Sequence, residues 1–288
     1  MYFERKTSMP SVTARHMELS KRMAAALRAP ERESRMADDL TPLGMLLRYW
    51  NLKVPTLEGT ASVMVNSYKC STPAFGGTVN EEKIKDAFIG VSKKKIIDES
   101  GGAYAYVDAF VGKASPETFE RVLALVYQYR EAFLSAYGKS HIEPYKTCAK
   151  VLSEDARAEL ILQTFCDKYM GLDCNGFVGN FVAKADHSLK LKGNSSIQYE
   201  FFPKKTVLRA SADEVQAKDL IIWSNFQHIA SIDEGLYDNF IVCQSTAGGP
   251  QASRGNSFVY HPREKLFSIE PSPVKFVGKV HIVSVGLS

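Results

Sequence analysis

The sequence lacks any run of about 18 consecutive apolar residues, the length that a membrane-spanning helix needs, so we expect no membrane span. It also lacks a strong excess of one charge: 36 Lys and Arg face 32 Asp and Glu, which leaves +4. So small an excess does not favour nucleic acid as a partner. The basic N-terminal segment has no apolar signal core. We therefore expect a cytoplasmic protein, or one that leaves its producer without a signal peptide.

Cysteine is scarce, and the number of cysteines is odd. The five residues follow no zinc-binding spacing, and a disulfide framework is not expected in a chain of 288 residues with so few of them. Reduced thiols leave room for one catalytic nucleophile, and we expect neither a metal nor another cofactor. The cysteines are Cys70, Cys148, Cys166, Cys174 and Cys243.

The chain divides into three regions by pattern. Residues 1–40 are predicted to form a basic flexible or helical arm, residues 41–150 a mostly helical region, and residues 151–288 the domain that carries the chemistry. A helix is predicted to begin at Pro116, with Ser115 as its N-cap, because an acidic first turn and an apolar periodicity follow. Further helices are predicted over Leu43–Trp50, over 151–170, and from about Cys174 onward.

From about residue 199 the pattern changes to short β-branched and aromatic segments between Gly, Pro, Asn and Asp. Helices followed by strands favour an α+β fold with a C-terminal antiparallel sheet. The glycine-rich residues 248–255 are predicted to form a loop at the rim of the site. The predicted strands are Tyr199–Phe202, Leu220–Trp223, His228–Ile232, Phe240–Gln244, Ser257–Tyr260, Leu266–Glu270 and Lys279–Val285.

Cys174 is the strongest candidate for a reactive residue. It follows Gly-Leu-Asp, which ends one helix, and it precedes an apolar periodic run that begins the next. Asp173 is placed to cap that helix, which leaves the thiol in the first turn, where the helix dipole favours an anion. Gly176 keeps nearby backbone accessible to a substrate or an oxyanion.

A thiol nucleophile also needs a base and a group that orients the base. His228 begins a predicted strand after a turn, and the next strand carries Gln244, whose amide oxygen can accept from an imidazole N–H. His261 and His281 are weaker candidates for the base, since one lies in a predicted turn and the other in the last strand. Cys243 is expected to point into the core.

These segments together resemble a known family. Leu172-Asp-Cys-Asn-Gly-Phe-Val is similar to the Asp-Cys-Ser-Gly-Phe-Val signature of the NlpC-type cysteine peptidases, the bacterial branch of the papain-like superfamily. Asp219-Leu-Ile-Ile-Trp and His228-Ile-Ala-Ser-Ile resemble that family's Gly-Asp-Leu-Val-Phe-Phe and His-Val-Gly-Ile strands, with Lys218 in place of the glycine. Phe240–Thr246 stands where the family has a strand with the third polar residue. The resemblance covers roughly residues 165–285.

The resemblance implies a papain-like fold, with a helical N-terminal part and a C-terminal antiparallel sheet. It implies Cys174 as nucleophile, His228 as base and Gln244 as the orienting residue. Substrate contacts are expected from Asp173 and Gly176, and from Tyr169, the nearest match to a family tyrosine that binds the substrate's amino end.

The implied substrate is a cell-wall peptide, cut through an acyl-cysteine intermediate. Without a signal peptide, such a peptidoglycan hydrolase would suit a toxin delivered by type VI secretion into a target cell's periplasm, with an immunity protein in the producer. A phage lysin or tail hydrolase, or a peptide-recycling enzyme, fits as well. Other classes stay open: a deamidase, acyltransferase or protease acting on a host protein or lipid, or a non-enzymatic module with a buried Cys174.

Overall fold

The computed structural model describes residues 41–57, 59–69, 93–101, 105–130, 154–186, 206–235, 239–271 and 278–286. All of them belong to one compact unit, residues 39–288. The predicted N-terminal arm, the strand predicted at Tyr199–Phe202 and the domain boundary predicted at residue 150 lie outside the described residues.

Two helices begin at side-chain caps, and the cap at Ser115 is the one that the sequence predicts. Thr41 Oγ1 accepts a hydrogen bond from Gly44 N at 3.0 Å, and Ser115 Oγ accepts one from Thr118 N at 3.3 Å. Both caps precede a proline at the first helical position, where a missing N–H costs nothing. The described helices are α2 (Pro42–Trp50), α4 (Lys93–Ser100), α5 (Ala105–Val111), α6 (Pro116–Gln128), α9 (Glu154–Tyr169), α10 (Cys174–Ala185) and the short 3-10 helix η3 (Ala212–Glu214).

A β-hairpin interrupts the helices of the N-terminal half. Strands β1 (Leu52–Pro55) and β2 (Thr60–Val63) pair antiparallel and bury alternate side chains. Helical side chains satisfy the outer edges: Lys53 N donates to Glu120 Oε1 at 2.8 Å, and Ser62 N donates to Glu159 Oε1 at 3.0 Å. An edge covered in this way cannot recruit a further strand. Neither strand of this hairpin was predicted from the sequence.

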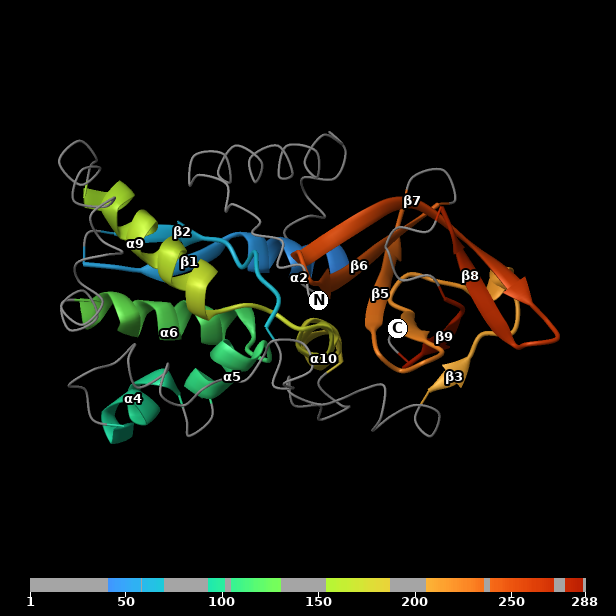
Figure 1. The fold of residues 1–288 in the computed structure, drawn as a ribbon, viewed down its shortest axis with the longest axis horizontal. Helices are drawn as coiled ribbons and strands as arrows, with labels where there is room; N and C mark the ends of the chain where they lie inside the picture. The colour runs from blue at the N-terminus through green and yellow to red at the C-terminus, as the bar shows by residue number, and fades with distance from the viewer. Residues whose placement is uncertain are drawn as a thin grey trace, which may run out of the picture. The chain divides into compact units, whose positions relative to one another are not determined.

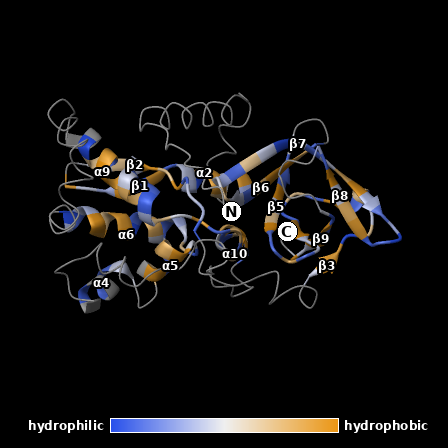
Figure 2. Ribbon diagram, in the orientation of Figure 1, coloured by the Kyte–Doolittle hydropathy of each residue, from blue (hydrophilic) through white to orange (hydrophobic). Residues whose placement is uncertain are grey.

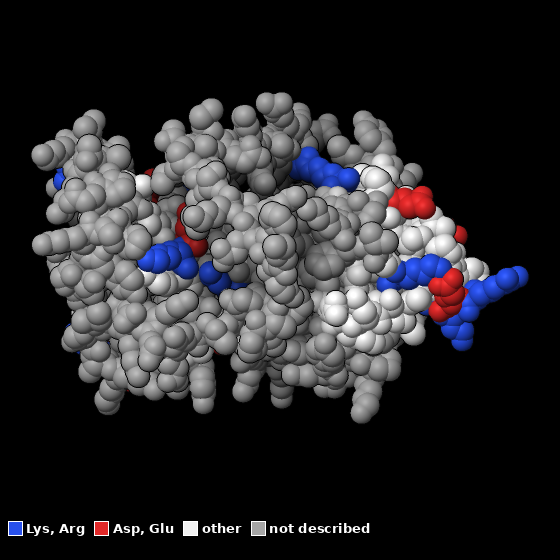
Figure 3. Space-filling view, viewed as in Figure 1, with Lys and Arg blue, Asp and Glu red and all other residues white. Residues whose placement is uncertain are grey.

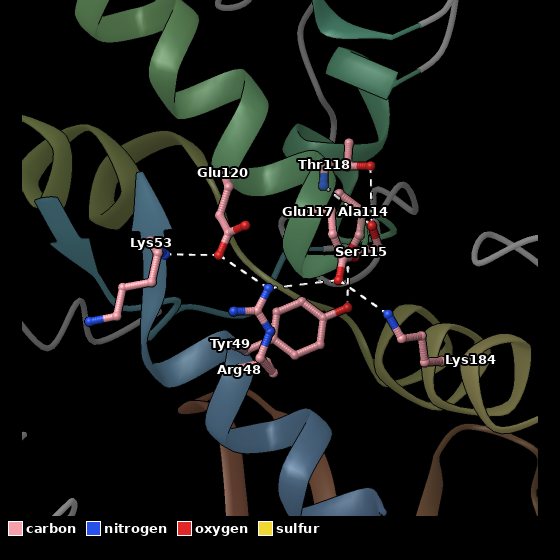
Figure 4. Close-up of polar contacts among 9 residues, drawn as sticks. All are labelled: Arg48, Tyr49, Lys53, Ala114, Ser115, Glu117, Thr118, Glu120 and Lys184. Carbon is pink, nitrogen blue, oxygen red and sulfur yellow. Dashed lines mark hydrogen bonds and ion pairs between the residues drawn. The ribbon is translucent and has the colours of Figure 1, made fainter. Parts of the chain in front are cut away.

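Ion pairs connect three of the helices around this hairpin (Figure 4). Arg48 of α2 lies 3.3 Å from Glu120 and 3.7 Å from Glu117, both on α6. Lys184 of α10 lies 3.6 Å from the same Glu117 carboxylate. Beneath them the buried Tyr49 hydroxyl donates to the carbonyl of Ala114 at 2.9 Å. The partly exposed ion pairs add little energy each, whereas the buried tyrosine fixes α2 against the start of α6.

The C-terminal strands close into a barrel, drawn in orange to red in Figure 1. All neighbouring strands are antiparallel, in the order β9-β4-β5-β6-β7-β8, and β8 pairs with β9 through Phe267 and Val280 to close the ring of six. β3 pairs antiparallel with the end of β9 at Val283 and Ser284. The strands are β3 (Val207–Leu208), β4 (Leu220–Trp223), β5 (Ile229–Glu234), β6 (Phe240–Thr246), β7 (Gly249–His261), β8 (Leu266–Glu270) and β9 (Val280–Ser284).

The predicted papain-like fold, with a helical N-terminal part and a C-terminal antiparallel sheet, is therefore wrong. The strands form a closed six-stranded antiparallel barrel, and the N-terminal half contains a hairpin. Closure depends on a single pairing between β8 and β9, which no local pattern encodes. The loop predicted over residues 248–255 is also wrong, because Gly249–Arg254 form the first half of β7.

Alternate residues of the barrel strands pack into two different hydrophobic cores. On β4, Ile221 and Trp223 pack inside the barrel, while Leu220 and Ile222 join the core shared with the helices. This explains why β4 is buried at every position rather than at every second one. Figure 2 shows the hydrophobic residues of α6, α9 and the barrel strands that supply the two cores. Helices α2 and α10 both contact β5 and β6.

Among the described helices, none is both long enough and apolar enough to cross a membrane. On the face shown in Figure 3, basic and acidic side chains of the described residues are interspersed around the barrel strands. Lys279 of the segment before β9 and Glu264 of the turn before β8 interact as a salt bridge.

Lys218 adopts a backbone conformation that suits glycine. Its φ is +72°, in the left-handed region, in the turn that leads into β4. We expect Lys218→Gly to raise the free energy of unfolding by up to about 1 kcal/mol, because the strain of a Cβ in this region is removed. Urea unfolding at pH 7 measures the difference. Lys218→Ala is the matched control, since it shortens the side chain but keeps the Cβ; equal stability of the two variants would contradict the explanation.

Candidate functional site

The candidate site includes the start of helix α10. Asp173 is its N-cap, as predicted: the residue is extended, and its Oδ1 accepts from Gly176 N. The preceding loop is held from three sides, because Leu172 N donates to Ser67 O at 2.9 Å, Asp173 N to Gly112 O at 3.0 Å, and Ser245 Oγ to Leu172 O at 2.6 Å. Backbone and side chains from the hairpin half and from β6 thus fix the position of Cys174.

The thiol of Cys174 is buried, with the residue 4% exposed. Its sulfur lies 3.8 Å from the Tyr68 hydroxyl, and the backbone N–H of Ile229 at the start of β5 hydrogen-bonds to it. Burial, and then the charge of Asp173, raise the pKa of the thiol to about 11, although Tyr68, Ile229 N–H and Lys113 act in the opposite direction. The thiol is therefore protonated at neutral pH, against our expectation that the helix start would favour the thiolate.

His228 and Gln244 form a hydrogen-bonded pair. His228 immediately precedes Ile229, and its Nε2 lies 2.8 Å from Oε1 of Gln244 on the neighbouring strand β6. Both side chains are buried, and the imidazole and Trp223 rings pack at an angle of 62° with their centroids 4.7 Å apart. Burial lowers the pKa of His228 to about 4, with the bond to Gln244 opposing the shift. The imidazole is neutral at pH 7, as a general base requires.

The hydrogen bond to Gln244 also selects the tautomer of His228. An amide oxygen can only accept, so the proton lies on Nε2 and the lone pair on Nδ1. Nδ1 is then the atom that can take a proton from a nucleophile. The structure thus brings these two predicted residues into contact, and their catalytic roles stay predictions.

In the structure, the three residues predicted to contact the substrate interact with other parts of the protein. The Asp173 carboxylate caps α10 through Oδ1 and pairs through Oδ2 with Lys113 Nζ at 2.6 Å. Gly176 packs so closely on Gly112 that a Cβ would lie 1.9 Å from its carbonyl oxygen. Tyr169 packs against Phe165, with ring centroids 4.9 Å apart. A role of these three residues in substrate binding stays a prediction.

The other candidate thiols and bases lie elsewhere. Cys166 and Cys243 are buried, and burial raises the pKa of both thiols well above the usual range. His261 interacts with Ser268 Oγ at 2.7 Å across β7 and β8, and His281 on β9 stacks on Phe226. Cys70 and Cys148 lie outside the described residues.

Two residues of the site were missed from the sequence. Tyr68 contacts the Cys174 sulfur from the segment after the hairpin, and Lys113 pairs with Asp173 from the turn between α5 and α6. Neither stands in a motif, and both are far from Cys174 in the chain, so only the fold brings them there. Within the described segments, no group of three His, Cys, Asp or Glu residues is arranged to hold a metal ion.

Comparisons of the chain with protein-family models, with curated proteins and with solved structures find no match.

Proposed function

We propose that this protein is a cysteine hydrolase that cleaves an amide bond through an acyl-cysteine intermediate, with Cys174 as nucleophile, His228 as base and Gln244 as the residue that orients the base. The observation that supports the proposal is that β5, which directly follows His228, and β6, which carries Gln244, both contact α10, the helix that begins at Cys174. The thiol at the start of α10 contacts the N–H of Ile229, and the adjacent His228 is held by Gln244 in the tautomer that a base needs.

We propose the following reaction. His228 Nδ1 takes the proton of the thiol as the sulfur attacks the substrate's carbonyl carbon. The developing oxyanion lies near the first turn of α10, where backbone N–H groups have no acceptor inside the helix. The C–N bond then breaks, the amine leaves with the proton from His228, and a thioester remains on Cys174. Water, deprotonated by His228, attacks the thioester; the C–S bond breaks, the acid is released, and the Cys174 sulfur takes the proton back from His228.

An uncharged resting state of Cys174 and His228 is compatible with this reaction. With a thiol pKa of about 11 and an imidazole pKa of about 4, the pair rests as thiol and neutral imidazole at pH 7. The proton transfer then accompanies the attack instead of preceding it.

We propose a cell-wall peptide as the substrate and delivery as an antibacterial effector as the biological setting. The support is the Leu172–Val178 sequence with the order of the histidine and glutamine strands behind it. An immunity protein in the producer and a secretion-system component would be the partners.

The test is to incubate the protein with purified peptidoglycan and analyse the released muropeptides by mass spectrometry. We expect one cleavage product, lost by at least about 1,000-fold in rate in Cys174→Ala and in His228→Ala, because nucleophile and base act as a unit. Cys243→Ala is the matched control: it removes an equally buried thiol from β6 and should keep the activity.

A specific observation favours one competing function. Cys174 is nearly inaccessible and its thiol is protonated, which also suits a non-enzymatic binding module with a structural cysteine. Full hydrolysis by Cys174→Ala would exclude the proposed nucleophile. No product from the unsubstituted protein would exclude peptidoglycan and direct the search to protein or lipid substrates.

A further inference from the structure

A buried ion pair lies directly beside the candidate nucleophile. Lys113 Nζ is 2.6 Å from Asp173 Oδ2, and both side chains are largely shielded from water. Surface ion pairs contribute little, but a buried carboxylate left without its partner is costly. Asp173 precedes Cys174, so whatever neutralises this carboxylate also determines the charge that the sulfur experiences.

The position of Lys113 is set by its backbone. Lys113 N donates to the carbonyl of Asp108 at 2.8 Å, and Asn180 Nδ2 of α10 donates to the carbonyl of Lys113 at 3.0 Å. Gly112 just before it has a φ of +79°, and a Cβ there would lie 2.0 Å from Lys69 O. The turn between α5 and α6 is thus built to direct this lysine to the start of α10.

We propose that Lys113 is a positioning residue for Cys174: its ammonium group holds the Asp173 carboxylate against the first turn of α10 and offsets its negative charge beside the sulfur. The inference rests on the proposed function in taking Cys174 as the nucleophile. Without Lys113, the Asp173 charge would oppose the negative charge that develops on sulfur.

The charged and titratable groups near the two residues are few among the described residues. Tyr68 from the segment after the hairpin faces the sulfur, and His228 adjoins the Ile229 N–H that contacts it. Lys113 is also close enough to Asp108 of α5 to lower the pKa of that carboxyl, which burial raises. Asp173 interacts with both Lys113 and Cys174.

Alkylation of Cys174 by iodoacetamide, followed peptide by peptide with mass spectrometry between pH 7 and 9, tests the inference without requiring turnover. In this range the rate follows the thiolate fraction. We expect Lys113→Met to raise the apparent pKa of Cys174 by about 1 and so to slow alkylation about tenfold at each pH. Asp173→Asn, which can still cap the helix, should speed it about tenfold, and the double variant should return close to the original rate.

A merely structural role for Lys113 predicts the opposite change in the alkylation rate. If Lys113 only anchored the loop, Lys113→Met would expose the thiol and speed alkylation, and Asp173→Asn would not restore the double variant; either result would overturn the inference. Lys113→Arg should stay within about threefold of the original rate, because it keeps the charge. Cys166 and Cys243 in the same samples report any general loosening, which should be absent.

Two further outcomes of these experiments also decide between the possibilities. If Lys113→Met does not fold, as judged by circular dichroism, a slower rate in Asp173→Asn would overturn the inference and a faster rate would support it. If the charge effects appear but no variant or unsubstituted protein hydrolyses an amide, the ion pair acts as inferred and the proposed hydrolase function fails.

Discussion

Replacing Gly176 by alanine is expected to lower the free energy of unfolding by about 3 kcal/mol or more. An alanine Cβ would lie 1.9 Å from the carbonyl oxygen of Gly112, a contact that neither backbone can relieve without moving α10 away from the turn between α5 and α6. The sign is informative, because glycine to alanine within a helix ordinarily stabilises by about 1 kcal/mol. Urea unfolding followed by circular dichroism at pH 7 measures the change.

Gly248→Ala is the matched control for this prediction. Gly248 lies in the exposed turn between β6 and β7, and a Cβ there would meet nothing within 4 Å. We expect its stability to stay within about 0.5 kcal/mol of the original. A Gly176→Ala protein as stable as the Gly248→Ala protein would mean that α10 does not approach Gly112 as described.

The second large effect is a loss of stability in acid that originates at His228. Its pKa is about 4 in the folded protein and about 6.5 in an unfolded chain. Between these values the unfolded chain binds more protons, so stability is complete above about pH 6.5 and is lost as the pH falls toward 4. The difference amounts to about 3 kcal/mol between pH 7 and pH 4.

Other groups titrate in the same range, so the measurement compares two proteins. The free energy of unfolding is determined at pH 7 and at pH 4 for the original protein and for His228→Asn, which cannot be protonated. We expect the original protein to lose about 3 kcal/mol more than the variant over this interval. Equal losses would show that His228 is as accessible to protons in the folded protein as in the unfolded chain.

Local features of the fold could be predicted from the sequence because their causes are local. The helix caps at Ser115 and Asp173 each depend on a side chain and an N–H a few residues apart. The strands Leu220–Trp223 and Leu266–Glu270 have the predicted bounds, since β-branched and aromatic residues define them against their turns. Helix α6 begins at Pro116, as predicted.

Features that depend on distant contacts could not be predicted. The pairing of Phe267 with Val280 closes the barrel, and the hairpin strands become strands because Glu120 and Glu159 complete their edges. A pattern of hydrophobic residues is the same for an open sheet and a closed one. The resemblance in residues 165–285 therefore led to the wrong fold although most of the strands were placed correctly.

In the candidate site, too, features with local causes could be predicted and features that depend on distant contacts could not. The contact between His228 and Gln244 follows from alternation on adjacent strands, which the sequence reveals. The environment of Cys174 does not: burial outweighs the helix start, and the compensating Lys113 comes from a distant turn. The protonation state of a nucleophile is thus a property of the packed fold, which a motif does not encode.

The most direct measurement of the central claim is the mass of the protein during turnover. The protein is mixed with purified peptidoglycan stem peptides, quenched in acid within milliseconds to seconds, and digested for peptide mapping. We predict an added acyl group, removed by hydroxylamine as a thioester is, on the peptide that carries Cys174, with none in Cys174→Ala and little in His228→Ala. Cleavage of the stem peptides with the acyl group on another residue, or by Cys174→Ala itself, would contradict the assignment of Cys174 as the nucleophile.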